Sequence, residues 1–209
     1  SPARDLPFVA CLKASEGFES GMIEVFPGKE KATRFALDNA MMMLFALSTA
    51  TLGTLEIHSS VTLWNGKGYA FLGKSGTGKS THSRLWKENI PGCELLNDDN
   101  PIIRIIDGQA RIYGSPWSGK TPCYKNLSAP LGAVVRISQS PENKIHRLSV
   151  IEAYASMFSS CSAFREIKDT ADGLHATLAE LVSKVPMYLL DCRPDAEAAH
   201  LCHSTVTGQ

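Results

Sequence analysis

Apolar and polar positions along the chain predict a mixed α/β fold with many hairpins. The clearest helix is predicted over residues 34–50, where Ala, Leu and Met dominate and Gly53 follows the last turn. Further helices are predicted at 81–89, 150–158, 170–184 and 195–201. Short apolar runs predict strands at 54–57, 61–64, 69–72, 94–96, 102–106, 110–113, 131–137 and 187–190. The order of these segments lacks the regular strand–helix–strand repeat of an all-parallel sheet.

Two-residue turn signals connect neighbouring strands. Asn65-Gly66 precedes the strand at 69–72, and Asp107-Gly108 precedes the strand at 110–113. The first 33 residues have a weaker pattern, with a strand expected over 8–12 and a turn at Pro27-Gly28. A chain of 209 residues is long enough to bury one core. We therefore expect a single domain over residues 1–209, in which 1–33 form a weakly assigned N-terminal segment.

Composition and charge narrow the classes of partner. Apolar residues make up 44% of the chain and charged residues 20%, as in ordinary soluble globular proteins. The formal net charge of zero gives no reason to expect nucleic acid or an anionic membrane as a partner. The longest uncharged run, 39–55, contains polar residues and is shorter than the roughly 20 apolar residues of a membrane span, so it predicts a buried helix. No signal peptide is visible.

The six cysteines are scattered, and no two of them form a C-x-x-C pair. In a chain of this length, that distribution favours reduced thiols in a cytosolic setting over a disulfide framework, so we expect a cytoplasmic protein. Cys192, His200, Cys202 and His203 gather near the C-terminus, but their spacing fits no common zinc pattern. We therefore expect no structural metal there.

Two segments match the spacing G-x-x-x-x-G-K-[ST] of a phosphate-binding loop: GKSGTGKS at 73–80 and GSPWSGKT at 114–121. The first follows the apolar strand 69–72 and precedes a helix, so that glycine N–H groups and a positive helix N-terminus can meet a phosphate. In the second, Pro116 removes a backbone donor, and later prolines leave too few positions for a following helix. We predict that 73–80 binds phosphate and that the second match is a coincidence of spacing.

The second match still allows two interpretations. Its glycines and prolines make a shaped, semi-rigid loop between two tyrosines. Lys120 could neutralise phosphate charge as a cationic clamp does in phosphoryl transfer. Alternatively, the segment is a surface loop whose Trp117 packs on the core.

The first match predicts which residues hold a nucleotide. Lys79 is expected to reach the β- and γ-phosphates, and the Ser80 hydroxyl is expected to bind Mg²⁺. ATP and Mg²⁺ are therefore the expected ligands. The predicted nucleotide-binding residues are Gly73, Lys74, Ser75, Gly76, Thr77, Gly78, Lys79, Ser80 and Thr81.

An acidic pair, Asp98 and Asp99, ends the next apolar strand. The helix after the phosphate loop is short, so this strand is expected to return beside 69–72 and to end on the same side as the loop. Adjacent residues on an extended chain point in opposite directions, so that one carboxylate can address the metal while the other accepts a proton. The alternative is that Asn97–Pro101 is simply a turn, for which its residues are well suited.

Two histidines lie near these motifs. His58 closes the strand 54–57, and the following hairpin could bring it back near the phosphates, although a lone His is more often a packed or capping residue. His82, within the helix after the loop, is expected on a solvated or packed face.

Residues 58–86 (HSSVTLWNGKGYAFLGKSGTGKSTHSRLW) and 95–101 (LLNDDNP) together resemble the kinase core of HPr kinase/phosphorylase and the nucleotide end of ATP-dependent phosphoenolpyruvate carboxykinase. Both families place a His about fifteen residues before the phosphate loop and an Asp-Asp pair at the end of a short strand after it. The resemblance covers residues 54–105 and implies an α/β fold with a mixed β-sheet P-loop kinase core and flanking helices. It also implies that His58 and one aspartate lie at the metal, and that the other aspartate is the base toward a serine hydroxyl.

Two departures from the HPr kinase pattern limit what the resemblance implies. Those kinases carry Glu after the loop Ser, whereas this chain has Thr81. Their later Glu-x-Arg-Gly signature is replaced by RIYGSPWSGK at 111–120. The resemblance therefore implies neither phosphorylase activity nor HPr as the substrate. A carboxykinase would need a second substrate-binding domain, for which the chain is too short.

The leading hypothesis is ATP-dependent, Mg²⁺-assisted phosphoryl transfer to a hydroxyl of a protein, peptide or small molecule. Lys79 and His58 act at the phosphates, Asp98 is the base, and Ser80, Asp99 and His58 lie at the metal, although the two aspartates could exchange roles. Further candidates for charge stabilisation are Lys120, Arg104 and Arg136.

Two other functions stay open. The chain could be a nucleotide-binding sensor or assembly module without catalysis, or it could perform phosphoenolpyruvate carboxykinase-like chemistry. HPr kinases assemble as hexamers, so the resemblance makes a homo-oligomer possible.

Overall fold

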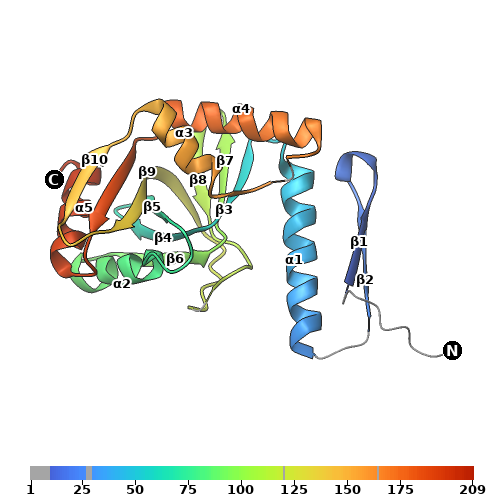
Figure 1. Cartoon of the computed structure of the whole chain (residues 1–209), viewed down its shortest axis with the longest axis horizontal. Helices are drawn as coiled ribbons and strands as arrows, with labels where there is room; N and C mark the ends of the chain where they lie inside the picture. Colours follow the sequence, from blue (N-terminus) through green and yellow to red (C-terminus); the bar gives the residue numbers. More distant parts are fainter. Residues whose placement is uncertain (1–9, 27–29, 120, 164) are drawn as a thin grey trace.

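The computed structural model describes residues 10–26, 30–119, 121–163 and 165–209 as a mixed α/β structure (Figure 1). The helices are α1 (Glu30–Thr49), α2 (Lys79–Asn89), α3 (Val150–Phe158), α4 (Lys168–Lys184), α5 (Ala196–Thr207) and the 3₁₀ helix η1 (Glu16–Phe18). The strands are β1 (Ala10–Ala14), β2 (Gly21–Val25), β3 (Thr54–Ile57), β4 (Ser59–Trp64), β5 (Lys67–Leu72), β6 (Glu94–Asp99), β7 (Ile102–Ile106), β8 (Gln109–Tyr113), β9 (Ser128–Gln139), β10 (Lys144–Arg147), β11 (Cys161–Ser162) and β12 (Met187–Cys192). The predicted mixed α/β class is confirmed.

Ten strands form one large mixed sheet in the described part of the chain, and β9 joins its two halves. The start of β9 pairs with β8, and its remainder lies between β5 and β12, parallel to both. On the other side of β5 the order continues through β4 to β6. Because β4 is antiparallel to both β5 and β6, these two strands run in the same direction. The C-terminal ends of β5 and β6 therefore open on the same edge of the sheet.

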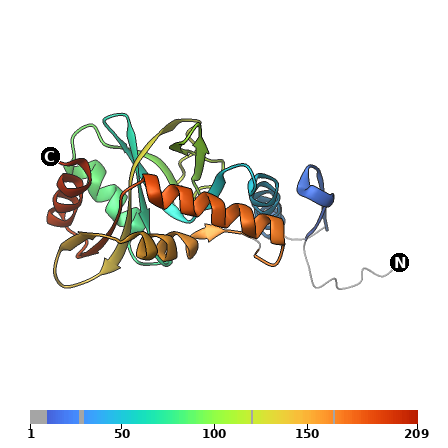
Figure 2. The same ribbon diagram turned by 90° about the horizontal axis from the view of Figure 1, so that it is seen from above.

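The central strands are buried on both faces, as the alternation of β5 shows. Ala70 and Leu72 pack into one core cluster, while Tyr69 and Phe71 pack into another. The first cluster also contains residues of α3 and α4, and the second contains residues of α2 and α5. Figures 1 and 2 show α4 and α2 on opposite sides of the sheet. A strand buried on both faces is expected to have a continuous apolar run, which is what made β5 recognisable.

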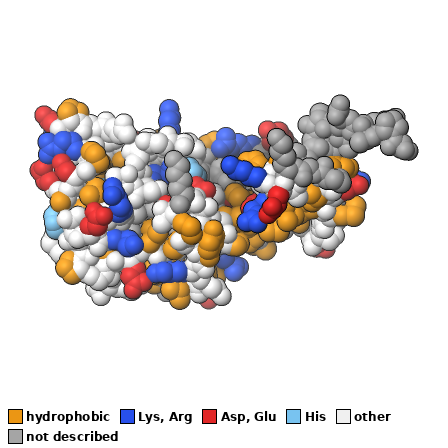
Figure 3. Space-filling model, turned by 90° about the horizontal axis from the view of Figure 1, so that it is seen from below, with side chains coloured by type: hydrophobic (Ala, Val, Ile, Leu, Met, Phe, Trp, Pro, Cys, Tyr) orange, Lys and Arg blue, Asp and Glu red, His pale blue; other side chains and the backbone are white. Residues whose placement is uncertain are grey.

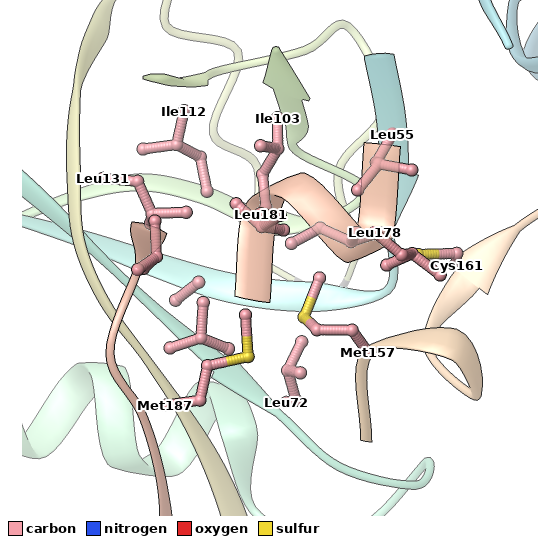
Figure 4. Close-up of a cluster of buried hydrophobic side chains, with 14 of the residues drawn as sticks. Leu55, Leu72, Ile103, Ile112, Leu131, Met157, Cys161, Leu178, Leu181 and Met187 are labelled. Carbon is pink, nitrogen blue, oxygen red and sulfur yellow. The ribbon is translucent and has the colours of Figure 1, made fainter. Parts of the chain in front are cut away.

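The larger core cluster lies where the sheet meets α3 and α4. Met157, Leu178 and Leu181 are fully buried and meet Ile103 and Ile112 from the sheet (Figure 4). Side chains this deeply buried supply most of the hydrophobic stabilisation, at about 1.5–3 kcal/mol each. This cluster fixes the sheet edge from which the phosphate-binding segments extend.

Residues 10–26 and 30–49 form an N-terminal arm beside the core (Figures 1 and 2). Strands β1 and β2 pair with each other and contact α1, whose end reaches β3. Only Ala40 and Leu47 of α1 are buried, whereas Phe35 is 71% exposed and Met41 is 41% exposed. Hydrophobic side chains accordingly gather on the α1 side of the molecule (Figure 3). The helix predicted over residues 34–50 is present as α1. The expectation that the uncharged run 39–55 forms a buried helix was wrong, because in the single chain α1 packs mainly on the arm strands and β3.

Most other predicted elements are confirmed within a few residues, including the hairpin turns at Asn65-Gly66 and Asp107-Gly108, where all four residues have positive φ. One placement was wrong: β6 pairs with β4 rather than returning beside β5. The hairpin partner of β5, strand β4, occupies that position. The C-terminal ends of β5 and β6 still lie on the same edge of the sheet, because β4 is antiparallel to both. Strands β2, β10 and β11 were not predicted. The start of the strand predicted at 8–12 and the Pro27-Gly28 turn lie outside the described residues.

All six cysteines lie in the described part of the chain, and none forms a disulfide. Burial raises the pKa of Cys93 and Cys192 to about 11, which keeps both thiols protonated near neutral pH. Among the described helices, none combines the length and apolar character that crossing a bilayer requires.

Candidate functional site

The first phosphate-loop match forms a tight loop between β5 and α2. Gly73, Gly76 and Gly78 have φ values of 156°, 83° and 104°, which side chains disfavour. The loop is closed by the Thr77 hydroxyl and backbone N–H, which both donate to the Lys74 carbonyl. We call residues 73–78 the glycine loop. It delivers the chain to the N-terminus of α2, where unpaired backbone N–H groups and the helix dipole favour an anion.

The glycine loop leaves space where a ligand could lie. A Cβ atom added at Gly76 or Gly78 would meet no atom within 4 Å, whereas one at Gly73 would come within 2.3 Å of the Thr77 hydroxyl oxygen. Gly73 is therefore required for packing within the loop. Gly76 and Gly78 face open space beside the helix N-terminus, as a phosphate group would require.

Lys79, His58 and Asp99 lie in contact across the site. The Lys79 Nζ lies 2.9 Å from His58 Nε2, and His58 Nδ1 lies 3.0 Å from a carboxyl oxygen of Asp99. A lysine ammonium can only donate, so His58 Nε2 accepts its hydrogen bond, and the other ring nitrogen, Nδ1, faces the Asp99 carboxylate. Burial lowers the pKa of Lys79, while the negative charges of Asp99 and Asp98 oppose that shift. The prediction that the hairpin brings His58 back toward the loop agrees with this geometry.

Asp98 and Asp99 end β6 as strand residues rather than as a turn, and both line the same cavity as the glycine loop. Asp99 is held on both oxygens, by His58 on one and by the Asn100 side-chain amide on the other. For Asp98, 4% exposed, no hydrogen bond to the carboxyl oxygens occurs among the described residues. The two carboxylates therefore differ: Asp99 is oriented by neighbours, and Asp98 is available to accept a proton.

The buried Asn97 side chain ties β6 to the second loop match. Its amide nitrogen donates to the Ser115 hydroxyl and to the carbonyls of Ser115 and Trp117, and its oxygen accepts from the Asp99 N–H. Gly119 N–H then donates to the Asp98 carbonyl at 2.7 Å. This network places residues 114–119, which we call the Trp117 loop, along the acidic end of β6.

The Trp117 loop has none of the geometry of a phosphate loop. No helix occurs between Thr121 and β9 in the described chain. A Cβ at Gly119 would approach the Asp98 carbonyl within 2.8 Å, so this glycine permits close contact with β6. Trp117 packs against Phe45 of α1 at a ring distance of 5.7 Å. Lys120, the predicted cationic clamp, lies outside the described residues.

Most of the predicted site residues meet in a cavity of about 450 Å³, although Gly73, Lys74 and Thr77 are not among its described lining residues. Its walls come from the β3–β4 junction, the glycine loop, the start of α2, the end of β6 and the Trp117 loop. The lining residues are His58, Ser59, Ser75, Gly76, Gly78, Lys79, Ser80, Thr81, Asp98, Asp99 and Gly119. We call this space the phosphate cavity. Segments that are 41 residues apart in sequence, from His58 to Asp99, thus converge at one sheet edge.

The two arginines suggested from sequence lie in different places. Arg136 of β9 is close enough to lower the pKa of Lys79. Its guanidinium donates to the Ser156 hydroxyl and carbonyl and to Ser159 and Ser160, which hold it in place. Arg104 lies exposed on β7 and is not among the described residues that line the phosphate cavity.

A second cavity, of about 610 Å³, adjoins the other side of the glycine loop. Gly76, Gly78 and Thr81 line both cavities. The far wall of the second cavity comes from the end of β9 and from the segment after β12, including Gln139 and Arg193. Gln139 donates to the Gly76 carbonyl at 3.3 Å and so contacts the glycine loop directly.

His82 of α2 packs beneath the second cavity. It is 2% exposed, and its Nε2 accepts a hydrogen bond from the Trp86 indole at 3.1 Å. Burial lowers the pKa of His82 to about 4, so it is neutral near pH 7. The packed alternative for His82 therefore applies.

Sequence reasoning missed several residues that shape the site. Hydrogen bonds from Asn97 and Gly119 hold the Trp117 loop against the acidic end of β6. The Ser160 carbonyl positions His58 by accepting a hydrogen bond from the His58 N–H at 2.8 Å. Asn97 was visible only as a polar residue at the end of an apolar strand. Gly119 was visible only as part of the second phosphate-loop match, and Ser160 had no local signal, because its partner is distant in sequence.

A metal ion at this site would be held by protein side chains together with a bound substrate. Within the described residues, no group of three His, Cys, Asp or Glu side chains is arranged to hold a metal ion. Magnesium commonly binds proteins through one or two side-chain oxygens together with substrate phosphates. The Ser80 hydroxyl and the Asp99 carboxylate, which both line the phosphate cavity, fit that donor set.

Comparisons with known proteins add one distant similarity. No protein-family model matches the chain, and no curated protein matches it. Among solved structures, the Hpr(Ser) kinase/phosphatase from Coxiella burnetii is similar at 12% sequence identity, with 73% of this chain and 88% of that chain covered and a TM-score of 0.43. This is a distant structural similarity.

Proposed function

We propose that this chain is a kinase that transfers the terminal phosphoryl group of ATP to a hydroxyl group of a protein, a peptide or a small molecule. One observation carries the proposal: an open glycine loop at a helix N-terminus, a buried lysine and two unlike carboxylates line one cavity. Phosphoryl transfer needs these parts, because it depends on positioning and on charge stabilisation more than on covalent chemistry by the protein.

The two adjoining cavities suit the two halves of a nucleotide. In this proposal the triphosphate lies over the glycine loop, with Lys79 reaching its β- and γ-phosphates. The base and sugar lie in the 610 Å³ cavity on the other side of the same loop, near Gln139 and Arg193. The three residues that line both cavities would then lie at the junction of sugar and phosphates.

The unequal surroundings of the two aspartates divide their roles. We assign Asp98 as the base, because its carboxyl oxygens are free of hydrogen bonds within the described residues. It accepts the proton of the acceptor hydroxyl as that oxygen bonds to the γ-phosphorus, and the bond to the β–γ bridging oxygen breaks to release ADP. Asp99, oriented by His58 and Asn100, is assigned with Ser80 to the metal.

Magnesium, when bound, supplies positive charge that offsets the charge of the β- and γ-phosphates. In the proposal Ser80 and Asp99 hold it. His58 was expected at the metal, but both of its ring nitrogens are engaged, one with Lys79 and one with Asp99. We therefore assign His58 to the positioning of those two side chains.

The test is to incubate the protein with labelled ATP and a lysate of its own organism, and to compare Asp98→Asn with the original chain. Loss of the base is expected to lower phosphoryl transfer by about 10²–10⁴-fold. Binding of Mg-ATP is expected to survive, since the asparagine has the same shape. Asp107→Asn, in the exposed turn between β7 and β8, is the matched control and should leave both quantities unchanged.

Two outcomes would contradict the proposal in different ways. Equal transfer by Asp98→Asn and the original chain would remove the base assignment. Tight Mg-ATP binding with no phosphate lost from ATP over hours would instead indicate a nucleotide-binding sensor.

A further inference from the structure

A buried acidic side chain lies between the core and the N-terminal arm, next to the phosphate cavity. Glu56 of β3 is 2% exposed. Neither of its carboxyl oxygens has a hydrogen bond of good geometry in the described residues, although the nearby Ser162 hydroxyl lowers its pKa against the effect of burial. Buried carboxylates in proteins are nearly always paired or hydrogen-bonded, so an unpartnered one indicates a missing partner.

Glu56 lines a cavity of about 160 Å³ beneath α1. We call it the Glu56 cavity; its residues are Asn39, Met42, Met43, Ala46, Glu56, Ser162 and Ala163. A cavity of about 150 Å³ can hold a molecule of the size of benzene. The methionines provide flexible, polarisable walls that adapt to an aliphatic chain. The cavity thus combines an apolar wall with one carboxyl group that lacks a well-formed hydrogen bond within the described part of the chain.

We propose that the Glu56 cavity binds a positively charged group of the phosphate acceptor, an ammonium or guanidinium on an aliphatic stem. This proposal rests on the proposed kinase function and names the class of its substrate. Glu56 would be the residue that selects this substrate. The stem would lie along Met42 and Met43, as Lys and Arg side chains commonly lie on apolar surfaces with their charge at the polar end.

A cation satisfies Glu56 in a way that other occupants do not. Water could hydrogen-bond Glu56 but would not favour its charged form, whereas an ammonium or guanidinium supplies both hydrogen bonds and a balancing charge to the carboxylate. Burial, aided by the negative charge of Asp99, raises the pKa of Glu56 to about 7 when no cation is present. A neighbouring cation favours the charged carboxylate and would reverse that shift.

The position of Glu56 relates the cation to the reacting hydroxyl. Glu56 precedes His58 by two residues, so their Cα atoms lie at most about 7 Å apart. His58 lines the phosphate cavity and bonds Asp99, and Asp99 is close enough to Glu56 to affect its pKa. In the proposal, an acceptor whose hydroxyl faces Asp98 reaches Glu56 with a group about two residues away along a peptide. In a peptide substrate, the proposal predicts Lys or Arg within two residues of the phosphorylated Ser.

The first experiment measures binding of a cation without any nucleotide. The probe is n-butylammonium, with neutral n-butanol as its matched control, followed by ligand-observed NMR on the intact chain. We expect n-butylammonium to bind and Glu56→Gln to weaken that binding at least about tenfold, while the weak binding of n-butanol stays the same. Gly78→Val, which alters the glycine loop alone, should bind n-butylammonium as the original chain does.

A second variant tests the same cavity if Glu56→Gln does not fold. Ala46→Met keeps the carboxyl group but fills the cavity, so it should also abolish n-butylammonium binding. Thermal melting of each variant checks that the fold is intact. Equal binding of n-butylammonium by the original chain and by a folded Glu56→Gln, or no binding by the original chain, would overturn the proposal.

The second experiment identifies the source of the cation. Pooled Ser-containing peptides are incubated with labelled ATP, and the phosphorylated products are sequenced. Enrichment of Lys or Arg within two residues of Ser, lost in Glu56→Gln, supports a basic peptide; phosphorylated products without that enrichment overturn it. If no peptide is phosphorylated, the peptide branch of the proposed function fails, and hydroxyl-bearing amines are tried in its place. The NMR result then decides the cation site independently.

Discussion

The two ends of the β3–β4 segment differ in how their polar groups are satisfied. Beyond His58, at the phosphate cavity, ionisable side chains lie in contact: Lys79 contacts His58, and His58 contacts Asp99. The buried hydroxyls of Ser59 and Thr62 on β4 lack a hydrogen-bond partner in the described residues. Before His58, under α1, the Glu56 carboxyl is in no ion pair and has no hydrogen bond of good geometry within the described part of the chain. The same short segment therefore contributes to a linked Lys–His–Asp group on one side and carries an unpaired carboxyl group on the other.

This difference indicates what kind of ligand each end of the segment is suited to bind. A preorganised network holds side chains in place for a ligand of fixed geometry such as a triphosphate. An unpartnered carboxyl beside flexible methionines leaves the final arrangement to a partner. The arm adds to the contrast, because α1 exposes large apolar side chains such as Phe35, while the helix of the phosphate end, α2, buries Leu85 and Trp86.

The largest expected effect comes from closing the open space at the glycine loop. In Gly78→Val, the branched side chain occupies the space that faces the ligand and is strained at a φ of 104°. Displacement of the backbone donors and of Lys79 is expected to lower ATP turnover by about 1,000-fold. The measurement is release of labelled phosphate at saturating Mg²⁺.

Gly92→Val is the matched control for this variant. Gly92 also has a positive φ, 77°, and open space around it, but it lies in the turn after α2. It carries the same backbone strain away from the phosphate cavity, so its turnover should stay within a few-fold of the original. A comparable loss in both variants would show that strain in α2, rather than the phosphate site, explains the effect.

That contrast also shows why the phosphate end could be predicted. The motif that contains the glycine loop is encoded within eight consecutive residues, 73–80, because each glycine meets a local backbone requirement and β5 and α2 adjoin the loop in sequence. The acidic pair needed only one further inference, that β6 ends on the same edge as β5. That inference held even though β4, rather than β6, is the neighbour of β5, since two antiparallel pairings restore the direction.

The Glu56 cavity could not be predicted, because its residues come from α1, β3 and the segment after α3. In the sequence, Glu56 is one charged residue at the end of an uncharged run, and Met42 and Met43 look like part of a buried helix. Apolar composition does not tell whether a helix meets its own core or a partner. The prediction of a buried α1 failed for that reason.

The second-largest expected effect is a difference in stability between the same substitution in the core and in the arm. Met157→Ala empties a fully buried site in the larger core cluster and is expected to lower the free energy of unfolding by about 3 kcal/mol. Met41→Ala, on the exposed side of α1, is expected to change it by less than about 0.5 kcal/mol. Urea denaturation of both variants checks this. A large loss in Met41→Ala would mean that α1 is covered in solution, as in a homo-oligomer.

The third effect is a pH dependence that originates at the phosphate end. The folded-state pKa of His82 is lowered to about 4 from an ordinary value near 6.5, so folding favours its neutral form. Its contribution to stability is complete above about pH 6.5 and is lost as the pH falls toward 4. By pH 5 the loss amounts to about 2 kcal/mol.

His82→Gln tests this assignment, because glutamine keeps an acceptor for the Trp86 indole but does not titrate. The free energy of unfolding is measured by urea denaturation at pH 7 and pH 5 for both chains. The original chain should lose about 2 kcal/mol more than the variant. An equal loss in both would assign the pH dependence to other groups.

The smallest global effect should come from the arm, although its local effect should be clear. A side chain at Gly21 of β2 would meet Leu44 of α1, since an added Cβ would lie 2.7 Å from a Leu44 methyl carbon. Gly21→Val should therefore separate the β1–β2 hairpin from α1 and speed hydrogen exchange of its amides. The free energy of global unfolding should change by no more than about 0.5 kcal/mol, because neither core cluster contains a hairpin residue.

Glu24→Val adds the same side chain at an exposed position of β2 and should leave exchange unchanged. A global loss above about 2 kcal/mol in Gly21→Val would show that the arm and the core unfold together, and the contrast between the two ends would then concern binding rather than stability.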